Sequence, residues 1–532
     1  MKAIHPIICA MLVVGGLTAC SEWDDHYKAS AEAGGNNLTL WQTMKQNQQL
    51  SDFCEVLQNT AVFRQHKKTS VSYADLLDSG QSFTVLAPVN GTFNKDSLLQ
   101  LVTTNQGDSM VEKSFVLNHL SRSNVSLFDQ MQQMRMANTK LVEIGNGKAG
   151  DITILTPNQH THNGILHILQ SQLPYSYNLY EAMTDLPQFQ TIGQTLRQYE
   201  EDFFDENKSL SSGMLDGVPI YVDSVVIERN QLLEGFGLIN AEDSTYLMVA
   251  PTNDGWQKAW DEAMPYFTFD ETVEKRDSLQ QYWASRALLD DAVFSMTLQN
   301  SPQDSLISGQ YNRLQPKYHV FYKPFDTGIL SNPERIIHCS NGTLYQTREW
   351  PFRPEDTYFQ ELKTEGEMES RIIDYSSCSY DTRIFSADSI SESGYLDIIP
   401  ASATANWNVT FRVDNTLAAC YDVCAVVLPK SVYNPTNPDL RPCKFRANIS
   451  YVDANGKQQN FNCENTNFIS DPLRVDTIVL AKAFSFPVCN YDQTNQKITV
   501  RLNCNILARE STTYAREMYL DCIYLRPAKR ED

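Results

Sequence analysis

The stretch Phe83-Thr-Val-Leu-Ala-Pro-Val-Asn-Gly-Thr-Phe93 decides how the first part of the chain is expected to fold. Its first residues are apolar or β-branched and predict a short buried strand. The strand should end at Ala87-Pro88, because proline fixes φ and has no N–H with which to continue a ladder. Asn90 then suits the N-cap of a following helix, where its side-chain oxygen would accept a bond from an amide that lacks a partner.

A second stretch, Tyr246-Leu-Met-Val-Ala-Pro-Thr-Asn-Asp-Gly-Trp256, repeats this order of residues. It again ends an apolar strand at Ala250-Pro251, and it again offers an asparagine, Asn253, as a helix N-cap. Ahead of both stretches, apolar residues recur near helical spacing, over 40–57 and over 179–196. Each of those two segments is therefore expected to form an amphipathic helix that opens a domain.

Each copy also closes on an Asn-Gly pair. The first copy has Asn163-Gly164-Ile-Leu-His-Ile-Leu169 and the second has Asn341-Gly342-Thr-Leu-Tyr345. Asn-Gly is the strongest short-range signal for a hairpin turn, and the residues after it are expected to form a strand. Three elements that recur in one order indicate an internal repeat of one α+β domain.

These elements resemble the fasciclin domain, whose hallmarks are a Thr-Val-(Phe/Leu)-Ala-Pro-x-Asn-x-x-Phe segment, a later histidine, and an Asn-Gly-x-(Ile/Val/Leu)-His strand. In the first copy the matching residues are Thr84, Ala87, Pro88, Asn90, Phe93, His119, Asn163, Gly164 and His167. In the second copy they are Ala250, Pro251, Asn253, Asn341 and Gly342. The resemblance implies two wedges of β-strands with packed helices, which act in adhesion to proteins, glycans or matrix rather than in catalysis.

The second copy departs from the family pattern in three places. Tyr345 stands where the strand histidine is expected, 291–295 offers no counterpart of His119, and an acidic stretch at 199–206 precedes the first motif. The expected domains are 38–175 and a more divergent 176–353.

The N-terminus predicts export and lipid anchoring. Lys2 and the short apolar stretch 7–17 are typical of a secretory signal. Leu17-Thr-Ala-Cys20 resembles the lipobox of bacterial lipoproteins, in which the cysteine is acylated; the alternative is an ordinary signal peptide with a buried cysteine. The acidic residues that follow resemble the surface-export signal of Bacteroidetes lipoproteins. We expect a signal peptide at 1–19, a tether at 20–37 and an outer-membrane, surface-exposed protein anchored through Cys20, because two or more acyl chains anchor stably.

From about residue 360 the pattern changes to alternating strands with turn residues between them. Five such segments, at 407–413, 421–428, 444–451, 497–504 and 517–524, predict an antiparallel β-sandwich over 360–532. The last of them resembles the final strand of jelly-roll carbohydrate-binding modules. A spacer domain without a ligand is the alternative.

Composition excludes one class of partner. The 532 residues carry a net charge of -21, which repels phosphate backbones, so no nucleic-acid partner is expected. Eight of the 12 cysteines lie between Cys378 and Cys522. Cys420 and Cys424 share one predicted strand about 13 Å apart, too far for a disulfide. Buried free thiols are the expected state for most of these cysteines.

No enzyme signature stands out, and no cofactor or metal is expected. There is no Gly-x-Ser-x-Gly and no His-Glu-x-x-His. His160, His162 and His167 lie close in sequence, but His119 and His167 are expected to be hydrogen-bonded core residues. The acidic pair Asp290-Asp291 is expected on a solvated face.

The sequence thus favours a lipid-anchored surface protein that binds a glycan or an extracellular protein. The alternative is an accessory scaffold of a glycan-import or cell-envelope complex, with transporter subunits as neighbours. Asp-Ser-apolar tripeptides predict O-glycosylation, for which Ser97, Ser278 and Ser305 are the preferred sites and Thr477 is expected to be buried.

Overall fold

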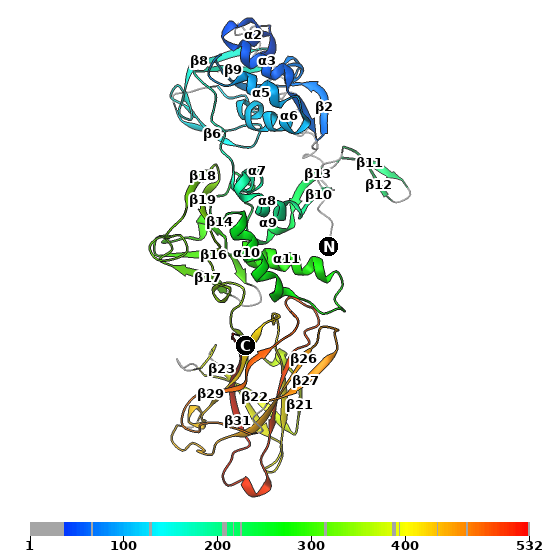
Figure 1. The fold of residues 1–532 in the computed structure, drawn as a ribbon, viewed down its shortest axis with the longest axis vertical. Coiled ribbons are helices and arrows are strands. Elements are labelled where there is room, and N and C mark those ends of the chain that lie inside the picture. Colours follow the sequence, from blue (N-terminus) through cyan, green and yellow to red (C-terminus); the bar gives the residue numbers. More distant parts are fainter. Residues whose placement is uncertain are drawn as a thin grey trace, which may run out of the picture. The chain divides into compact units, whose positions relative to one another are not determined.

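The computed structural model divides the chain into two compact units, Met1–Tyr177 and Asn178–Asp532 (Figure 1). It describes residues 37–64, 67–126, 130–204, 210–215, 218–223, 226–312, 317–385, 390–392, 394–433, 435–463 and 467–529. The predicted signal peptide, Cys20 and nearly all of the tether lie outside these ranges. Within them, no helix is both long and apolar enough to cross a membrane.

The first unit is built on a seven-stranded sheet that contains one parallel pair of strands. Its order is β4 (Leu120–Ser121), β3 (Phe83–Pro88), β9 (Gly164–Leu169), β8 (Ile152–Thr161), β7 (Lys148–Ala149), β6 (Leu141–Gly145) and β5 (Gln132–Arg135). Strand β3 is buried throughout its length and ends at Pro88, as predicted. It pairs in parallel with β9, so that Phe83 lies opposite Gly164. A separate hairpin joins β1 (Ala61–Arg64) to β2 (Lys67–Ser72).

Five short helices pack with this parallel pair. They are α2 (Leu40–Gln46), α3 (Ser51–Asn59), α4 (Tyr73–Asp78), α5 (Lys95–Leu101) and α6 (Asn105–Val111). Leu40, Phe53, Val85, Phe115 and Leu166 are nearly or fully buried and share one hydrophobic core. The apolar spacing read from the sequence is therefore the core-facing stripe of the helices.

Helices are present at the start of each copy, as predicted, but a 3-10 turn divides each predicted segment into two helices. In the first copy the helix breaks at Asn47, whose side chain accepts a 3.0 Å hydrogen bond from the Gln49 amide and so begins a 3-10 turn. In the second copy, α7 (Leu179–Asp185) and α8 (Gln190–Arg197) are separated by a turn that begins at Pro187. Helical periodicity continues across both breaks because a 3-10 turn keeps the apolar residues on nearly the same face.

Asn90 does not cap the helix that follows it, so this prediction is wrong. That helix, α5, is capped by Asn94, which accepts from the Ser97 amide at 3.1 Å. The Oδ1 of Asn90 instead accepts a 2.9 Å bond from the Asp52 amide in the first turn of α3. Its Nδ2 donates to the Gln48 carbonyl at 2.8 Å. Asn90 therefore closes the N-terminus of a helix that precedes it by about forty residues.

The second copy repeats this long-range cap. The Oδ1 of Asn253 accepts a 3.0 Å bond from the Thr191 amide of α8, and its Nδ2 donates to the Pro187 carbonyl at 2.9 Å. Asn253 is itself the first residue of α10 (Asn253–Ala263), with Thr252 at the cap position. The motif asparagine thus joins the strand-to-helix turn to the opening helices in both domains.

We expect Asn90→Ala to lower the free energy of unfolding by about 1–2 kcal/mol through the lost cap. Amide hydrogen exchange should accelerate in the first turn of α3 and stay unchanged in α5. In the matched variant Asn94→Ala, hydrogen exchange should accelerate in the first turn of α5 and stay unchanged in α3. Faster exchange in α5 after Asn90→Ala would contradict the assigned contact.

The first part of the second unit repeats the parallel pair of strands of the first unit. Its sheet has the order β15 (Val293–Ser295), β14 (Tyr246–Pro251), β19 (Gly342–Thr347) and β18 (Arg335–Cys339). Strand β14 is parallel to β19, with Tyr246 opposite Gly342. The copies therefore share their topology at both motifs, which confirms the internal repeat. Helices α9 (Gln231–Phe236), α10 and α11 (Arg276–Leu289) accompany this sheet.

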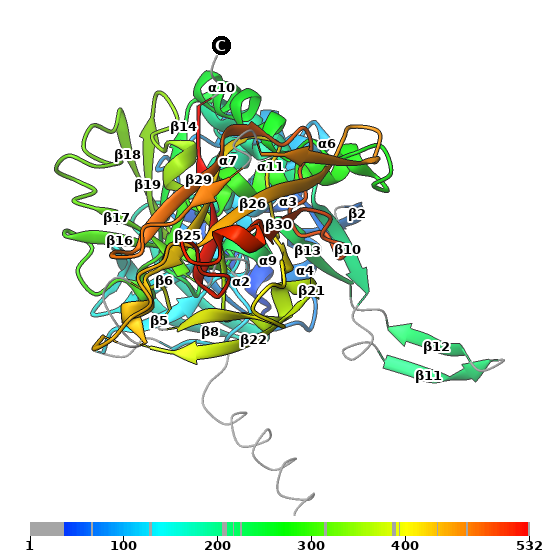
Figure 2. The ribbon, with the colours of Figure 1, turned by 90° about the horizontal axis from the view of Figure 1, so that it is seen from below.

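The acidic stretch of the second copy forms part of an added β ribbon. Strand β10 (Glu200–Phe204) pairs with β13 (Val226–Asn230), and β11 (Leu210–Leu215) pairs with β12 (Val218–Asp223), a hairpin visible in Figure 2. Another hairpin joins β16 (Ser305–Asn312) to β17 (Lys317–Tyr322). The latter hairpin brings His319 to the candidate site described below.

Residues 362–527 form the predicted antiparallel sandwich of two six-stranded sheets. One sheet has the order β22 (Cys378–Ile384), β23 (Gly394–Pro400), β31 (Met518–Pro527), β25 (Cys420–Leu428) and β29 (Asp476–Ser485), with β20 (Leu362–Glu365) on β31. The other has the order β21 (Ile372–Ser376), β24 (Asn408–Arg412), β30 (Thr499–Cys504), β26 (Lys444–Val452) and β27 (Gln458–Asn462), with β28 (Phe468–Ile469) on β26. All five predicted strands are present. Their apolar residues meet around Trp407, which is 2% exposed.

Most cysteines of the described residues are buried free thiols, namely Cys54, Cys420, Cys424, Cys443, Cys463, Cys489, Cys504 and Cys522. Cys420 and Cys424 lie on β25, as predicted. Burial raises the pKa of the Cys443 thiol to about 11, which keeps this thiol protonated and unreactive.

The second α+β domain is fastened to the sandwich by its chain after α10. The Ala418 amide donates to the Tyr266 carbonyl at 2.9 Å, and the Glu271 amide donates to the Ala454 carbonyl at 2.9 Å. Phe267 belongs to the same core cluster as Trp407 of the sandwich. These contacts hold two walls of one cavity in place.

Candidate functional site

The residues of the repeated motifs hold the core of each domain together. Thr84 and Ala87 are fully buried on β3, and Ala250 is fully buried on β14. The Thr84 hydroxyl donates to the Ser123 carbonyl at 2.6 Å. Phe93 packs against a core phenylalanine, and Pro88 and Pro251 end their strands.

Both predicted core histidines are buried neutral groups. His119 donates from Nδ1 to the Phe115 carbonyl at 2.7 Å and accepts at Nε2 from the Leu173 amide at 2.9 Å. Burial lowers the pKa of His119 to about 4. His167 bridges the Asn158 amide and the Val125 carbonyl in the same way, and burial also lowers its pKa. Each ring therefore ties a loop to a strand.

A metal site formed by the three clustered histidines is not present. His160 and His162 are exposed, whereas His167 is buried. In the described part of the chain, no three His, Cys, Asp or Glu side chains are grouped so that they could hold a metal ion. Carboxyl groups do gather in the sandwich, where burial raises the pKa of Glu365 to about 7 and the Ser391 hydroxyl donates to it at 2.8 Å.

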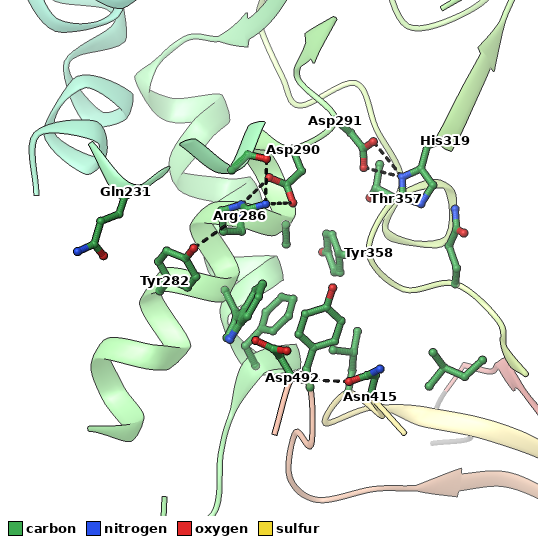
Figure 3. Close-up of a pocket in the computed structure, with 18 of the residues that line it drawn as sticks. Gln231, Tyr282, Arg286, Asp290, Asp291, His319, Thr357, Tyr358, Asn415 and Asp492 are labelled. Carbon is green, nitrogen blue, oxygen red and sulfur yellow. Dashed lines mark hydrogen bonds and ion pairs between the residues drawn. The ribbon is translucent and has the colours of Figure 1, made fainter. Parts of the chain in front are cut away.

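The candidate site is a cavity of about 530 Å³ between helices α9 and α11 and the loops of the sandwich (Figure 3). That volume lies in the usual range for small-molecule sites. Its aromatic lining comprises Phe267, Tyr282, Trp283, Tyr358, Tyr421 and Tyr491. Its polar lining includes Gln231, Glu234, Arg286, Asp290, Asp291, His319, Thr357, Gln360, Asn415 and Asp492.

One wall of the cavity is an ion-paired network on α11 (Figure 3). Arg286 donates to both carboxylate oxygens of Asp290, at 2.6 and 3.1 Å, and to the Tyr282 hydroxyl at 3.1 Å. It also donates to the Gly235 carbonyl of α9 at 3.2 Å. Burial raises the pKa of Asp290 to about 6, although Arg286 opposes that shift. The guanidinium is thus fixed by the protein rather than left to bind an anion.

A second wall is formed by Asp291 and His319. The Nδ1 of His319 lies 2.8 and 2.9 Å from the two carboxylate oxygens of Asp291, as Figure 3 shows. The Asp291 side chain is 5% exposed. The pair Asp290-Asp291 is therefore not the solvated face expected from the sequence, because one acid pairs with Arg286 and the other is buried against a histidine from β17.

Three buried polar atoms of the cavity lining have no hydrogen-bond partner within the described residues. They are Nε1 of Trp283, Nε2 of His319 and Oε1 of Gln360. His319 and Gln360 also line a neighbouring cavity of about 450 Å³, so the two hollows meet at these residues. Leaving a buried polar atom unpaired costs about 1–3 kcal/mol, and a ligand or an ordered water would remove that cost.

The aromatic side chains give the cavity an apolar body. The ring of Trp283 lies 4.8 Å from that of Tyr491 and 5.2 Å from that of Tyr282, both near edge-to-face. Phe267 contacts Tyr358 with ring centroids 6.0 Å apart. Contacts between the rings hold them in fixed orientations.

The sandwich contributes two loop residues with left-handed backbones. Asn415 has φ +62° and Asp492 has φ +52°. The Asp492 amide donates to Oδ1 of Asn415 at 3.0 Å, and the Asn415 amide donates to the Gln496 side chain at 3.0 Å. Such conformations cost energy for residues other than glycine and gather at ligand sites. Here they place the exposed Asp492 carboxyl at the cavity.

Sequence reasoning missed this site. Its residues come from distant segments, including α11, β17 and the loops before β25 and β30, and no segment carries a recognisable motif. The acidic pair at 290–291 was the one local signal.

The three preferred glycosylation sites differ in exposure. Ser97 on α5 and Ser278 on α11 are exposed, and Ser305 on β16 is half-buried. Thr477 is exposed on β29, contrary to the expected burial. O-glycosylation itself stays a prediction.

No family model matches the chain, and no curated protein matches it. Among solved structures, a FAS1 domain pair from the insect cell adhesion molecule fasciclin I is similar at 12% identity, over 52% of this chain and 90% of that chain, with a TM-score of 0.20. A xylan-binding domain of CBM 22 is similar at 11% identity over 32% of this chain and 95% of its own, with a TM-score of 0.20. A family 35 carbohydrate binding module from Clostridium thermocellum is similar at 10% identity over 32% and 99%, with a TM-score of 0.18. Superpositions this loose carry no conclusion about fold or function.

Proposed function

We propose that this chain is a non-enzymatic binding protein of the cell surface that holds a saccharide in the cavity of its second unit. The observation that carries the proposal is the set of unpartnered buried atoms on Trp283, His319 and Gln360 beside fixed aromatic rings. A sugar ring presents C–H groups on its faces and hydroxyls at its edge, so it can pack on rings and satisfy polar atoms together. The adjoining second cavity provides room for more than one sugar unit.

The test is calorimetric titration of the full chain with neutral hexaoses of β-1,4-glucan, β-1,4-mannan and β-1,4-xylan. At least one should bind. Trp283→Phe keeps an aromatic ring but removes the unpartnered Nε1–H, and it should weaken binding about 5- to 10-fold, the value of one buried hydrogen bond. Trp350→Phe is the matched control, since Trp350 lies in the same unit but does not line the cavity.

Two results would contradict this proposal. One is the absence of binding to any of the three hexaoses. The other is equal weakening by Trp283→Phe and Trp350→Phe, which would place the saccharide elsewhere. A scaffold role in a glycan-import or envelope complex remains the second candidate, favoured if the chain binds transporter subunits and no saccharide.

Anchoring at Cys20 is part of the same proposal and rests on the Leu17-Thr-Ala-Cys20 motif. Cys20→Ser removes the thiol that would be acylated. In the native host, this variant should move from the membrane fraction to the soluble fraction, because a chain without acyl groups has no stable anchor. Unchanged membrane retention would show that the motif is not a lipobox.

A further inference from the structure

The charged donor of the cavity lining is committed to the protein itself, and the unpartnered donor, Nε1–H of Trp283, is uncharged. The guanidinium of Arg286 donates to Asp290, to the Tyr282 hydroxyl and to the Gly235 carbonyl. The side-chain amide of Gln360 donates to the Asp356 carbonyl at 2.9 Å. An acidic ligand would need the donors of Arg286 and Gln360, and each of these already has an acceptor.

Two other polar atoms of the lining residues, in contrast, are buried without a partner within the described part of the chain. Nδ1 of His319 lies 2.9 Å from a carboxylate oxygen of Asp291, so Nε2 is the ring nitrogen left for another partner. That Nε2 and the Oε1 of Gln360 have no partner within the described residues. The Gln360 oxygen therefore offers lone pairs to a group that carries hydrogens.

The charges of the cavity wall also disfavour an acidic ligand. Asp290 is neutralised by Arg286, and Glu234 is neutralised by Arg229 at 2.6 Å. Asp291 pairs with a histidine, and Asp492 stands exposed at the opposite wall. A carboxylate or sulfate on the ligand would meet this negative charge, whereas hydroxyls and ammonium groups would not be repelled.

We propose that the cavity selects saccharides whose polar groups donate hydrogen bonds, namely hydroxyl-rich or amine-bearing sugars, and rejects uronic acids and sulfated sugars. This selectivity rests on the proposed function, since it concerns the same site. The selectivity follows from the hydrogen-bonding groups and the charges of the cavity wall, whereas the aromatic lining supports saccharide binding in general.

The experiment uses the full chain and matched probes at about pH 8, above the pKa of about 6 of Asp290. The hexaoses of β-1,4-glucan and β-1,4-mannan are titrated as prepared and after oxidation of their primary hydroxyls to carboxylates. The oxidised form of a bound hexaose should bind at least about tenfold more weakly. The β-1,4-linked glucosamine hexaose should bind at least as tightly as the glucan.

Asp492→Asn removes the exposed charge at the cavity and keeps a side chain of the same shape. This variant should reduce the ratio of the affinities for the neutral and the oxidised hexaose by about threefold or more. Asp374→Asn is the control, because Asp374 is exposed on β21 away from the cavity and its loss changes the net charge equally. This control should leave the ratio of the two affinities unchanged. The comparison separates local repulsion from the overall charge of -21.

Oxidised hexaoses that bind as tightly as neutral ones overturn the selectivity but leave saccharide binding intact. The selectivity is also overturned if Asp492→Asn and Asp374→Asn reduce the affinity ratio equally, because the repulsion would then come from the net charge of the whole chain. If no neutral, oxidised or amine-bearing hexaose binds, the proposed function fails and the selectivity fails with it.

Discussion

Replacing Asn163 with alanine should lower the free energy of unfolding of the first unit by about 2–4 kcal/mol. Asn163 is 3% exposed. Its Oδ1 accepts a 2.7 Å bond from the Leu40 amide at the start of α2. Its Nδ2 donates to the carbonyls of Leu77 at 2.9 Å and Ser79 at 2.6 Å. Alanine would leave two buried groups, the Leu40 amide and the Leu77 carbonyl, without a partner, and each such group costs about 1–3 kcal/mol.

The measurement is hydrogen exchange across α2, α4 and β9 of the full chain under increasing denaturant, which reports the stability of this unit separately. Asn59→Ala is the matched control, because Asn59 is exposed and donates one bond to Glu55 of its own helix. That control should cost less than about 0.5 kcal/mol. A loss below about 1 kcal/mol for Asn163→Ala would show that Asn163 does not join these elements.

Gly164→Ala should be at least as damaging, with a loss of about 3 kcal/mol or more from backbone strain and overpacking. A Cβ at this position would lie 1.9 Å from the Phe83 carbonyl oxygen of the adjacent parallel strand. The backbone at Gly164 also has φ +155°, which residues with a side chain rarely adopt. Since the obstacle is main chain in the middle of the sheet, it cannot rotate away as a side chain would.

Gly91→Ala separates the two contributions in the same unit. Gly91 has φ +74°, but an added Cβ would meet nothing within 4 Å. It should therefore cost about 1 kcal/mol, the conformational part alone. Gly342→Ala should reproduce the large loss in the second unit, where the added Cβ would lie 2.0 Å from the Tyr246 carbonyl oxygen. Equal losses for Gly164→Ala and Gly91→Ala would rule out the close approach of β3 and β9.

The sequence alone determined the local elements and their repetition. Apolar runs marked β3 and β14, and their Ala-Pro pairs marked the strand ends. Alternation marked the five predicted strands of the sandwich. These features follow from periodicity and from the chemistry of proline, which act over a few neighbouring residues. Strand periodicity also placed Cys420 and Cys424 on one strand, at a separation that excludes a disulfide between them.

The tertiary structure decided what the motif residues are for. Asn90 was predicted to cap the next helix, since the sequence shows only its neighbours, and it caps an earlier one. Asn163-Gly164 signalled a turn, but the asparagine also fastens α2, and the glycine makes room for the Phe83 carbonyl on a parallel strand. Both roles depend on backbone groups about eighty residues away or more, which no local pattern encodes.

The candidate site lies further beyond sequence reasoning. Trp283, His319, Tyr358 and Asp492 each look ordinary in their own segment, and the pair at 290–291 looked solvated. They meet because the chain after α10 docks on the sandwich and closes a cavity that neither part forms alone. Local composition determined which residues form strands and helices, whereas docking determined which polar atoms were left buried without a partner, and that is what makes the cavity a place for a ligand.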